Sequence, residues 1–194
     1  LKQLMAGAMK VLNETGTALV GGHTSEGAEM SLGFAINGLV DRERILRKSG
    51  MKPGDKIILT KPIGTGALFA ADMRHKARGK WVHDALLSML QSNKKGADIL
   101  FANGASACTD VTGFGLLGHL VEMAKPSGVN VALCLPDIPI LEGAVDLIKE
   151  GIFSSLQPQN VRLRRAIKNV EKAAEDIRYP IIFDPQTSGG LLAR

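Results

Sequence analysis

The stretch ACTDVTGFGLLGHL, residues 107–120, carries the most informative local pattern in the chain. It opens with a short run typical of a strand, continues through three glycines within six residues, and ends in an apolar segment with helical spacing. Glycine permits tight turns and close backbone approach, so the pattern predicts a strand that turns sharply into a helix. Asp110 lies at this turn, flanked by Thr109 and Thr112. The stretch therefore either forms a backbone turn that requires glycine or holds a charged ligand near the main chain.

Strand-like and helix-like segments alternate on both sides of this stretch. Without a strict βαβ rhythm, they favour an α+β fold in which helices cover a mixed β-sheet. A polar segment with a Pro-Gly turn, residues 41–55, is the candidate domain boundary, and we divide the chain into 1–50 and 51–194. We expect helices over 1–13, 64–73, 82–90, 97–103, 115–125, 141–151 and 161–177, and strands over 17–20, 31–40, 56–63, 105–111, 129–135 and 179–185.

The composition is that of a globular chain, with 45% hydrophobic and 22% charged residues among 194. No apolar run reaches about 18 residues, the length of a membrane span, and the amino terminus does not resemble a signal peptide. We therefore expect a cytoplasmic protein. The net charge is +5, but only eight residues are aromatic and no nucleic-acid motif is present. A solvated basic surface is favoured over a nucleic-acid groove, and the charge would also attract a polyanion such as a nucleotide.

The cysteines and histidines give weak signals. Cys108 and Cys134 lie 26 residues apart without a CxxC pattern, so we expect small buried side chains on strands rather than a zinc site or a disulfide. His119 falls five residues into an apolar helix pattern and is interpreted as a core or helix-face residue. His23 lies in a glycine-rich loop, where it could donate a hydrogen bond to phosphate.

Three glycine-rich junctions follow predicted strands: LVGGHTSEG (19–27), TKPIGTGAL (60–68) and TDVTGFGLLG (109–118). Glycines let the backbone approach an anion, and amides at a helix start can point toward it. None of the three matches the dinucleotide fingerprint or the phosphate loop of nucleotide-binding proteins. Each is equally compatible with a tight strand-to-helix turn.

Asp110 is the sharpest single candidate. A carboxylate at a strand end suits Mg²⁺ that bridges phosphates, and the neighbouring threonines can supply hydroxyls. The alternative is that Asp110 caps the following helix or forms an Asx turn. The residues alone leave both interpretations open.

Four motifs in this order carry a family resemblance: LVGGHTSEG (19–27), KPGDKIILTKPIGTG (52–66), ACTDVTGFGLLGHL (107–120) and FDPQTSGGLLA (183–193). They closely resemble the selenophosphate synthetase (selenide, water dikinase) family of the aminoimidazole-ribonucleotide-synthetase-like superfamily. The resemblance implies a homodimeric enzyme that converts ATP, selenide and water into selenophosphate, AMP and orthophosphate, with Mg²⁺ and usually K⁺. It implies an amino-terminal dimerisation domain and a carboxy-terminal α+β domain, with ATP bound between them.

The resemblance also implies roles for individual residues. Asp110 would be the metal-binding aspartate that the carboxy-terminal domain supplies. Gly21, Gly22, His23 and Thr24 would form a loop that reaches ATP bound mainly by the other subunit.

The departure from the family pattern is large. The nucleophilic Cys or selenocysteine, the nearby Lys and three further metal-binding aspartates of the family precede the region that matches here. We expect a carboxy-terminal part: residues 1–50 as a remnant of the amino-terminal domain and 51–194 as a carboxy-terminal domain truncated at its end. Because Asp110 alone cannot organise a metal cluster around ATP, we expect no catalytic residue and no synthetase activity in the isolated chain.

Two other interpretations remain open at this stage. One is another ATP-using enzyme of the superfamily, similar to thiamine-monophosphate kinase or to the hydrogenase-maturation dehydratase. The other is a non-catalytic module for dimerisation or regulation. The upstream sequence separates them, because a Cys or selenocysteine closely followed by Lys in a glycine-rich loop would indicate selenium chemistry.

Overall fold

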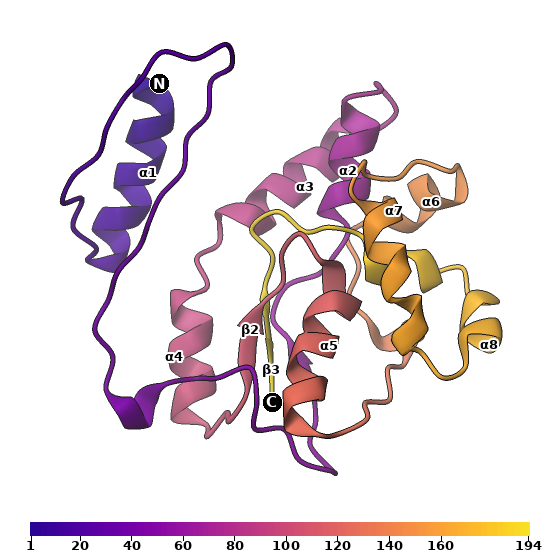
Figure 1. Cartoon of the computed structure of the whole chain (residues 1–194). Helices are drawn as coiled ribbons and strands as arrows, with labels where there is room; N and C mark the ends of the chain where they lie inside the picture. Colours follow the sequence, from indigo (N-terminus) through magenta and orange to yellow (C-terminus); the bar gives the residue numbers. More distant parts are fainter. The chain divides into compact units, whose positions relative to one another are not determined.

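A computed structural model describes all 194 residues of the chain (Figure 1). The chain divides into two compact units, Leu1–Ile45 and Leu46–Arg194. Each unit is described by itself. The predicted boundary between residues 50 and 51 stays a prediction.

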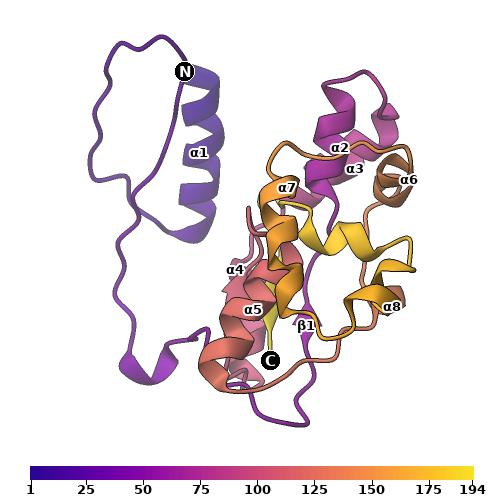
Figure 2. The same ribbon diagram turned by 45° about the vertical axis from the view of Figure 1, so that its right-hand side comes forward.

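The amino-terminal unit consists of one helix and a long extended stretch. Helix α1 (Lys2–Thr15) ends at Gly16, which adopts a left-handed conformation with φ of 69°. A single 3₁₀ turn follows much later, η1 (Arg42–Arg44). Figure 2 shows the extended chain looping beside α1. The predicted helix at the amino terminus is confirmed.

The two strands predicted over 17–20 and 31–40 are wrong, because neither segment is a strand in the structure. Their large apolar side chains are exposed, Val20 by 94% and Ile36 by 78%. A strand needs a neighbouring backbone for its amide and carbonyl groups, and these segments have none within the unit. An alternating sequence pattern alone does not make a strand.

The carboxy-terminal unit is built on a small antiparallel sheet in the order β1-β3-β2. Strand β3 (Leu191–Ala193) lies in the middle, between β1 (Ile58–Leu59) and β2 (Cys108–Asp110). In this register Asp110 is opposite Leu191. The predicted strands over 56–63 and 105–111 are therefore present, although shorter than expected.

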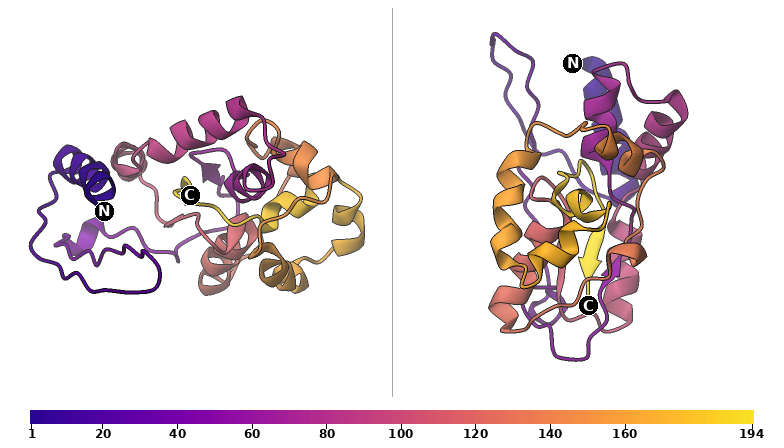
Figure 3. Two further views of the ribbon diagram at one scale, coloured as in Figure 1. Left: turned by 90° about the horizontal axis from the view of Figure 1, so that it is seen from above. Right: turned by 90° about the vertical axis from the view of Figure 1, so that its right-hand side faces the viewer.

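Helices cover both faces of this sheet. Figure 1 shows α4 and α5 on opposite sides of β2 and β3, and the views in Figure 3 place the carboxy-terminal strand among the helices. Leu100 of α4 packs with Leu191 on one face, whereas Leu192 belongs to the larger core on the other. An α+β fold is therefore confirmed. The helices are α2 (Thr65–Asp72), α3 (Gly79–Leu90), α4 (Lys94–Ala102), α5 (Gly115–Ser127), α6 (Ala144–Lys149), α7 (Gln157–Asn160) and α8 (Val170–Ala174). The 3₁₀ turns are η2 (Leu135–Asp137), η3 (Val161–Ala166) and η4 (Tyr179–Phe183).

Two segments differ in type from the prediction. Residues 161–177 form η3 and α8 rather than one helix, because the Ile167 amide donates to Arg164 O, three residues back, and ends the first turn. Residues 179–183 form η4 rather than a strand. Proline is well tolerated in the first turn of a helix, and Pro180 occupies that place in η4. Residues 181–183 are apolar and buried, as in a central strand, and this pattern led to the strand prediction.

The predicted strand over 129–135 is also wrong. Residues 129–134 carry no ladder hydrogen bonds, and a cavity of about 640 Å³ lies between them and residues 51–59. Cys108 is buried as predicted, but Cys134 is exposed because its segment lies outside the sheet.

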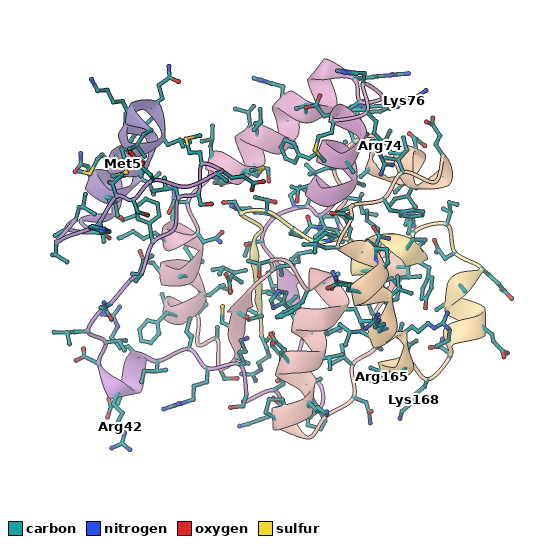
Figure 4. All side chains as sticks on the ribbon, turned by 45° about the horizontal axis from the view of Figure 1, so that its top comes forward. Met5, Arg42, Arg74, Lys76, Arg165 and Lys168 are labelled. Atoms are coloured by element: carbon teal, nitrogen blue, oxygen red, sulfur yellow. The ribbon has the colours of Figure 1, made fainter.

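The surface agrees with the basic composition. Arg74, Lys76, Arg165 and Lys168, labelled in Figure 4, are all exposed. No helix of the chain is both long enough and apolar enough to cross a membrane.

Candidate functional site

Three of the glycine-rich segments meet at one edge of the sheet. We name them the β1 turn (residues 60–66), the β2 turn (residues 110–115) and the β3 turn (residues 184–190). Because β3 runs antiparallel to its neighbours, the ends of β1 and β2 lie beside the start of β3. The topology therefore joins segments that are far apart in the sequence.

Backbone hydrogen bonds fix the β2 turn to the β3 turn. The Val111 amide donates to Gly190 O at 2.8 Å, which continues the ladder beyond the strands. The Gln186 amide donates to Thr112 O at 3.0 Å, and the Gly115 amide donates to the same carbonyl. The two turns are thus held together by backbone hydrogen bonds.

Side chains of the β3 turn cap helix α2, which starts in the β1 turn. Gln186 Oε1 accepts hydrogen bonds from the Gly64 amide at 2.9 Å and the Thr65 amide at 3.2 Å. Asp184 Oδ2 accepts from the Gly66 amide at 3.0 Å. The amides at this helix start are therefore occupied, and the structure favours the tight-turn interpretation of the GTG segment over an open anion site.

Asp184 is fully buried in this cluster. Burial raises the pKa of its carboxyl to about 7, although hydrogen bonds from Gln186 and the Gly66 amide oppose the shift. Its Oδ1 atom has no hydrogen-bond partner. The carboxyl therefore binds a proton at nearly neutral pH, unlike an exposed aspartate.

Several glycines at this edge leave no room for a side chain. A Cβ atom at Gly66 would lie 2.5 Å from Pro185 O, and a Cβ at Gly189 would collide with Val111 O. Gly115 adopts a φ of 71° and would meet Phe183 backbone at 2.9 Å. The glycines thus allow the three turns to approach one another closely, which is the backbone role that the sequence indicated for them.

Asp110 is exposed at the end of β2. Side chains alternate along a strand, so Asp110 shares a face with Cys108, whereas Thr109 is buried on the opposite face. No hydrogen bond or ion pair involves the Asp110 carboxylate, and helix α5 has no side-chain cap. The capping role considered for Asp110 is therefore not what the structure contains. Its role as a metal ligand stays a prediction.

The β2 turn is held from outside by two side chains that the sequence did not single out for this purpose. The Thr112 amide donates to His119 Nε2 at 3.0 Å. Asn160 Nδ2 donates to Gly113 O at 2.7 Å. His119 is only 3% exposed, which confirms its interpretation as a core residue. The spacing of His119 within the apolar helix indicated its burial, but no pattern indicated its contact with Thr112.

Lys61 is a buried residue that sequence reasoning missed. It is 4% exposed, and its Nζ donates to Gln91 O at 2.6 Å and to Ser188 O at 3.0 Å. No carboxylate pairs with it, and burial lowers the pKa of its ammonium group. Lys61 links the β1 and β3 turns to the connection between α3 and α4.

The remaining motif, residues 19–27, lies in the amino-terminal unit. Gly21, Gly22, His23 and Thr24 are all exposed and belong to no helix or strand. They belong to a different unit from Asp110. Their role toward a nucleotide stays a prediction.

The chain does not hold a complete metal site by itself. No group of three or more His, Cys, Asp or Glu side chains that could bind a metal ion occurs among the 194 residues. One exposed carboxylate falls short of the several oxygen ligands that Mg²⁺ requires. The residues present therefore do not complete a Mg²⁺ site, and Asp110 supplies one carboxylate toward it.

Comparison with known proteins identifies relatives of the whole chain. The family model of the AIR synthase related protein, C-terminal domain, matches residues 52–177. A selenide, water dikinase of Geobacter metallireducens is 41% identical over 192 residues, covering 99% of this chain and 56% of that protein. One of Trichlorobacter lovleyi is 40% identical over 195 residues, covering 99% and 55%. Selenide, water dikinase 2 of Peptoclostridium acidaminophilum is 42% identical over 190 residues, covering 97% and 54%. The chain spans about half the length of these curated relatives.

Proposed function

The chain belongs to the family of AIR synthase related proteins, and we propose that it is the carboxy-terminal part of a selenide, water dikinase. The reaction would be the ATP-dependent formation of selenophosphate from selenide, with release of AMP and orthophosphate. The observation that carries this proposal is the similarity of nearly the whole chain, at about 40% identity, to relatives of that name. The meeting of three family motifs at one sheet edge supports it.

Asp110 is the residue of this part that acts on the metal in our proposal. Its carboxylate is exposed and unpaired, while hydrogen bonds to Gly190 and Gln186 fix the backbone that follows it. A carboxylate held this way is available as one oxygen ligand to Mg²⁺ on the phosphates of ATP. The remaining ligands would come from the other part of the enzyme.

Gly21, Gly22, His23 and Thr24 would approach ATP from a partner subunit of a homodimer. Their exposure and the glycine pair agree with a loop that contacts a ligand outside its own unit. The enzyme would act in the cytoplasm, where ATP and Mg²⁺ are available, and would use K⁺ as well. The isolated chain would be inactive because a single carboxylate cannot hold the metal ions around a triphosphate.

A chimera tests the proposal directly. The aligned half of the Geobacter metallireducens selenide, water dikinase is replaced by this chain, and AMP formation from ATP is measured with and without selenide. We expect selenide-dependent AMP formation from the chimera and none from the 194-residue chain alone. A chimera with a normal melting temperature that turns over ATP only with a different small-molecule acceptor would contradict the assignment to selenium.

Asp110→Asn in the same chimera tests the site. Asparagine keeps the size of the side chain but loses the charge that binds Mg²⁺, so turnover should fall by at least about a hundredfold while the melting temperature is retained. Asp72→Asn, the same exchange at an exposed residue of α2 outside the three turns, is the matched control and should leave turnover unchanged. Normal turnover by Asp110→Asn would remove the proposed role of Asp110.

A further inference from the structure

His119 reaches from helix α5 back to the β2 turn. Its Nε2 atom lies 3.0 Å from the Thr112 amide nitrogen and 3.2 Å from Thr112 Oγ1. Thr112 lies two residues after Asp110, at the point where the chain leaves the sheet. The imidazole therefore holds the segment that directly follows the exposed carboxylate.

These contacts define the protonation of the ring. A backbone amide can only donate, so Nε2 must be the accepting nitrogen and the proton lies on Nδ1. Nδ1 faces Glu122 Oε2 at 3.1 Å, and the same oxygen accepts from Lys48 Nζ at 2.7 Å. A chain of hydrogen bonds thus runs from Lys48 through Glu122 and His119 to the backbone of Thr112.

The surroundings favour the neutral imidazole that the Thr112 hydrogen bond requires. Burial lowers the pKa of His119, while Glu122 acts in the opposite direction. Lys48 lowers the pKa of Glu122. The ring of Phe114 lies 5.7 Å from the imidazole, centroid to centroid, and restricts it further. A neutral ring retains the lone pair on Nε2 that the Thr112 amide needs.

Asp110 is fixed on both sides by different means. On the strand side, β2 pairs with β3, and Asp110 lies opposite Leu191. On the turn side, the amide of Thr112 is held by His119. Loss of the second bond would leave a half-buried amide without a partner and free the turn to move.

We propose that His119 is a positioning residue for Asp110: it fixes the β2 turn, through the Thr112 amide, in the conformation that presents the carboxylate. This inference rests on the proposed role of Asp110 as a metal ligand. His119 itself is buried, and it acts on the β2 turn through its contacts with Thr112.

Two substitutions of His119, to Gln and to Asn, separate its two hydrogen bonds, and a third removes both. His119→Gln can place an acceptor oxygen near the position of Nε2, so it retains a partner for Thr112. His119→Asn is too short to reach Thr112 but can still donate toward Glu122. His119→Phe keeps an aromatic ring beside Phe114 and lacks both nitrogens, and it serves as a second test if His119→Asn melts early.

Hydrogen exchange of the Thr112 amide, followed by NMR on the 194-residue chain, is the first measurement. We expect exchange to be about tenfold faster in His119→Asn and His119→Phe, because one hydrogen bond of about 1.4 kcal/mol is lost. In His119→Gln the rate should stay within about threefold of the unsubstituted chain. Equal exchange rates in all four proteins would overturn the proposal.

The second measurement uses Mn²⁺ alone as the probe of the carboxylate. Titration with Mn²⁺ should broaden the amide signals of residues 109–113, and Asp110→Asn should abolish this broadening. The Mn²⁺ concentration for half broadening should rise at least about threefold in His119→Asn and His119→Phe, and His119→Gln should restore it. Faster exchange of Thr112 with an unchanged Mn²⁺ midpoint would overturn a positioning role.

Failure of the proposed function gives a different result. If Asp110→Asn leaves the broadening intact, Asp110 is not the ligand, and both its proposed role and its positioning by His119 are overturned. The exchange rates would still report on the contact between His119 and Thr112. The two failures are therefore distinguishable in one set of samples.

Discussion

The sheet edge of the carboxy-terminal unit and the extended stretch of the amino-terminal unit, residues 17–41, begin from similar sequence patterns. Both contain alternating apolar residues and glycine-rich loops. In the first, three turns bind one another through backbone and side-chain hydrogen bonds. In the second, the apolar side chains stay exposed and no ladder forms.

The difference shows that an alternating apolar pattern forms a strand only where a neighbouring strand can pair with it. Strand β3 is three residues long, yet it persists because β1 and β2 flank it on both sides. Residues 31–40 form a longer pattern and find no neighbour within their unit. The glycines of the sheet edge follow the same rule, since a side chain at Gly66, Gly115 or Gly189 would collide with a neighbouring backbone.

The largest effect expected from this comparison is that of Gly189→Ala. A Cβ atom at this position would collide with Val111 O, and a backbone carbonyl in a ladder cannot move aside easily. We expect a loss of about 3 kcal/mol or more in the free energy of unfolding, measured by urea denaturation.

Gly22→Ala is the matched control in the other region. No atom lies within 4 Å of a Cβ at Gly22, and the residue is exposed. The free energy of unfolding should change by less than about 0.5 kcal/mol. Similar losses for both substitutions would mean that the glycines of the two regions do not differ in their packing.

A smaller effect concerns the pH dependence that Asp184 gives to the sheet edge. Burial raises the pKa of its carboxyl from 3.8 to about 7, so the folded state binds this proton more tightly than the unfolded state. The stabilisation is complete below the unfolded pKa and is lost as pH rises toward the folded pKa. Between pH 4 and pH 6 this group alone should lower the free energy of unfolding by about 2 kcal/mol.

Asp184→Asn removes the titrating group and keeps the shape of the side chain. The difference in free energy of unfolding between the two proteins, measured at several pH values, isolates Asp184 from the other carboxyls. We expect the unsubstituted chain to lose stability relative to Asp184→Asn as pH rises from 4 to 6. A difference that does not vary over this range would show that folding does not raise the pKa of this carboxyl.

The sequence predicted the parts of the fold that depend on local pattern. Helix α5 starts and ends where apolar spacing, Gly115 and Gly128 indicate, and the strand–turn–helix arrangement around Asp110 is as expected. The helices α1 to α4 follow for the same reason. These elements depend mainly on residues within a few positions of one another.

The missed features depend on residues distant in sequence. The cap of helix α2 comes from Gln186, about 120 residues later, and the acceptor for the Thr112 amide is a histidine side chain in the next helix. Pattern reasoning has no means to find such partners before the topology is known. The prediction of a strand at residues 181–183 failed for a related reason. A continuous apolar run is buried on all sides both in a central strand and in a covered 3₁₀ turn, so the pattern does not separate the two.

The smallest effect is expected in the extended stretch itself. Ile36 is 78% exposed, so Ile36→Thr removes apolar surface that is already in water. In dilute solution the free energy of unfolding should change by less than about 0.5 kcal/mol. A loss above about 1 kcal/mol would mean that residues 31–40 bury Ile36 in solution, and the contrast between the two regions would fail. Sedimentation at the same concentrations identifies the cause: a mass that falls with the substitution indicates pairing of this segment with a second copy of the chain.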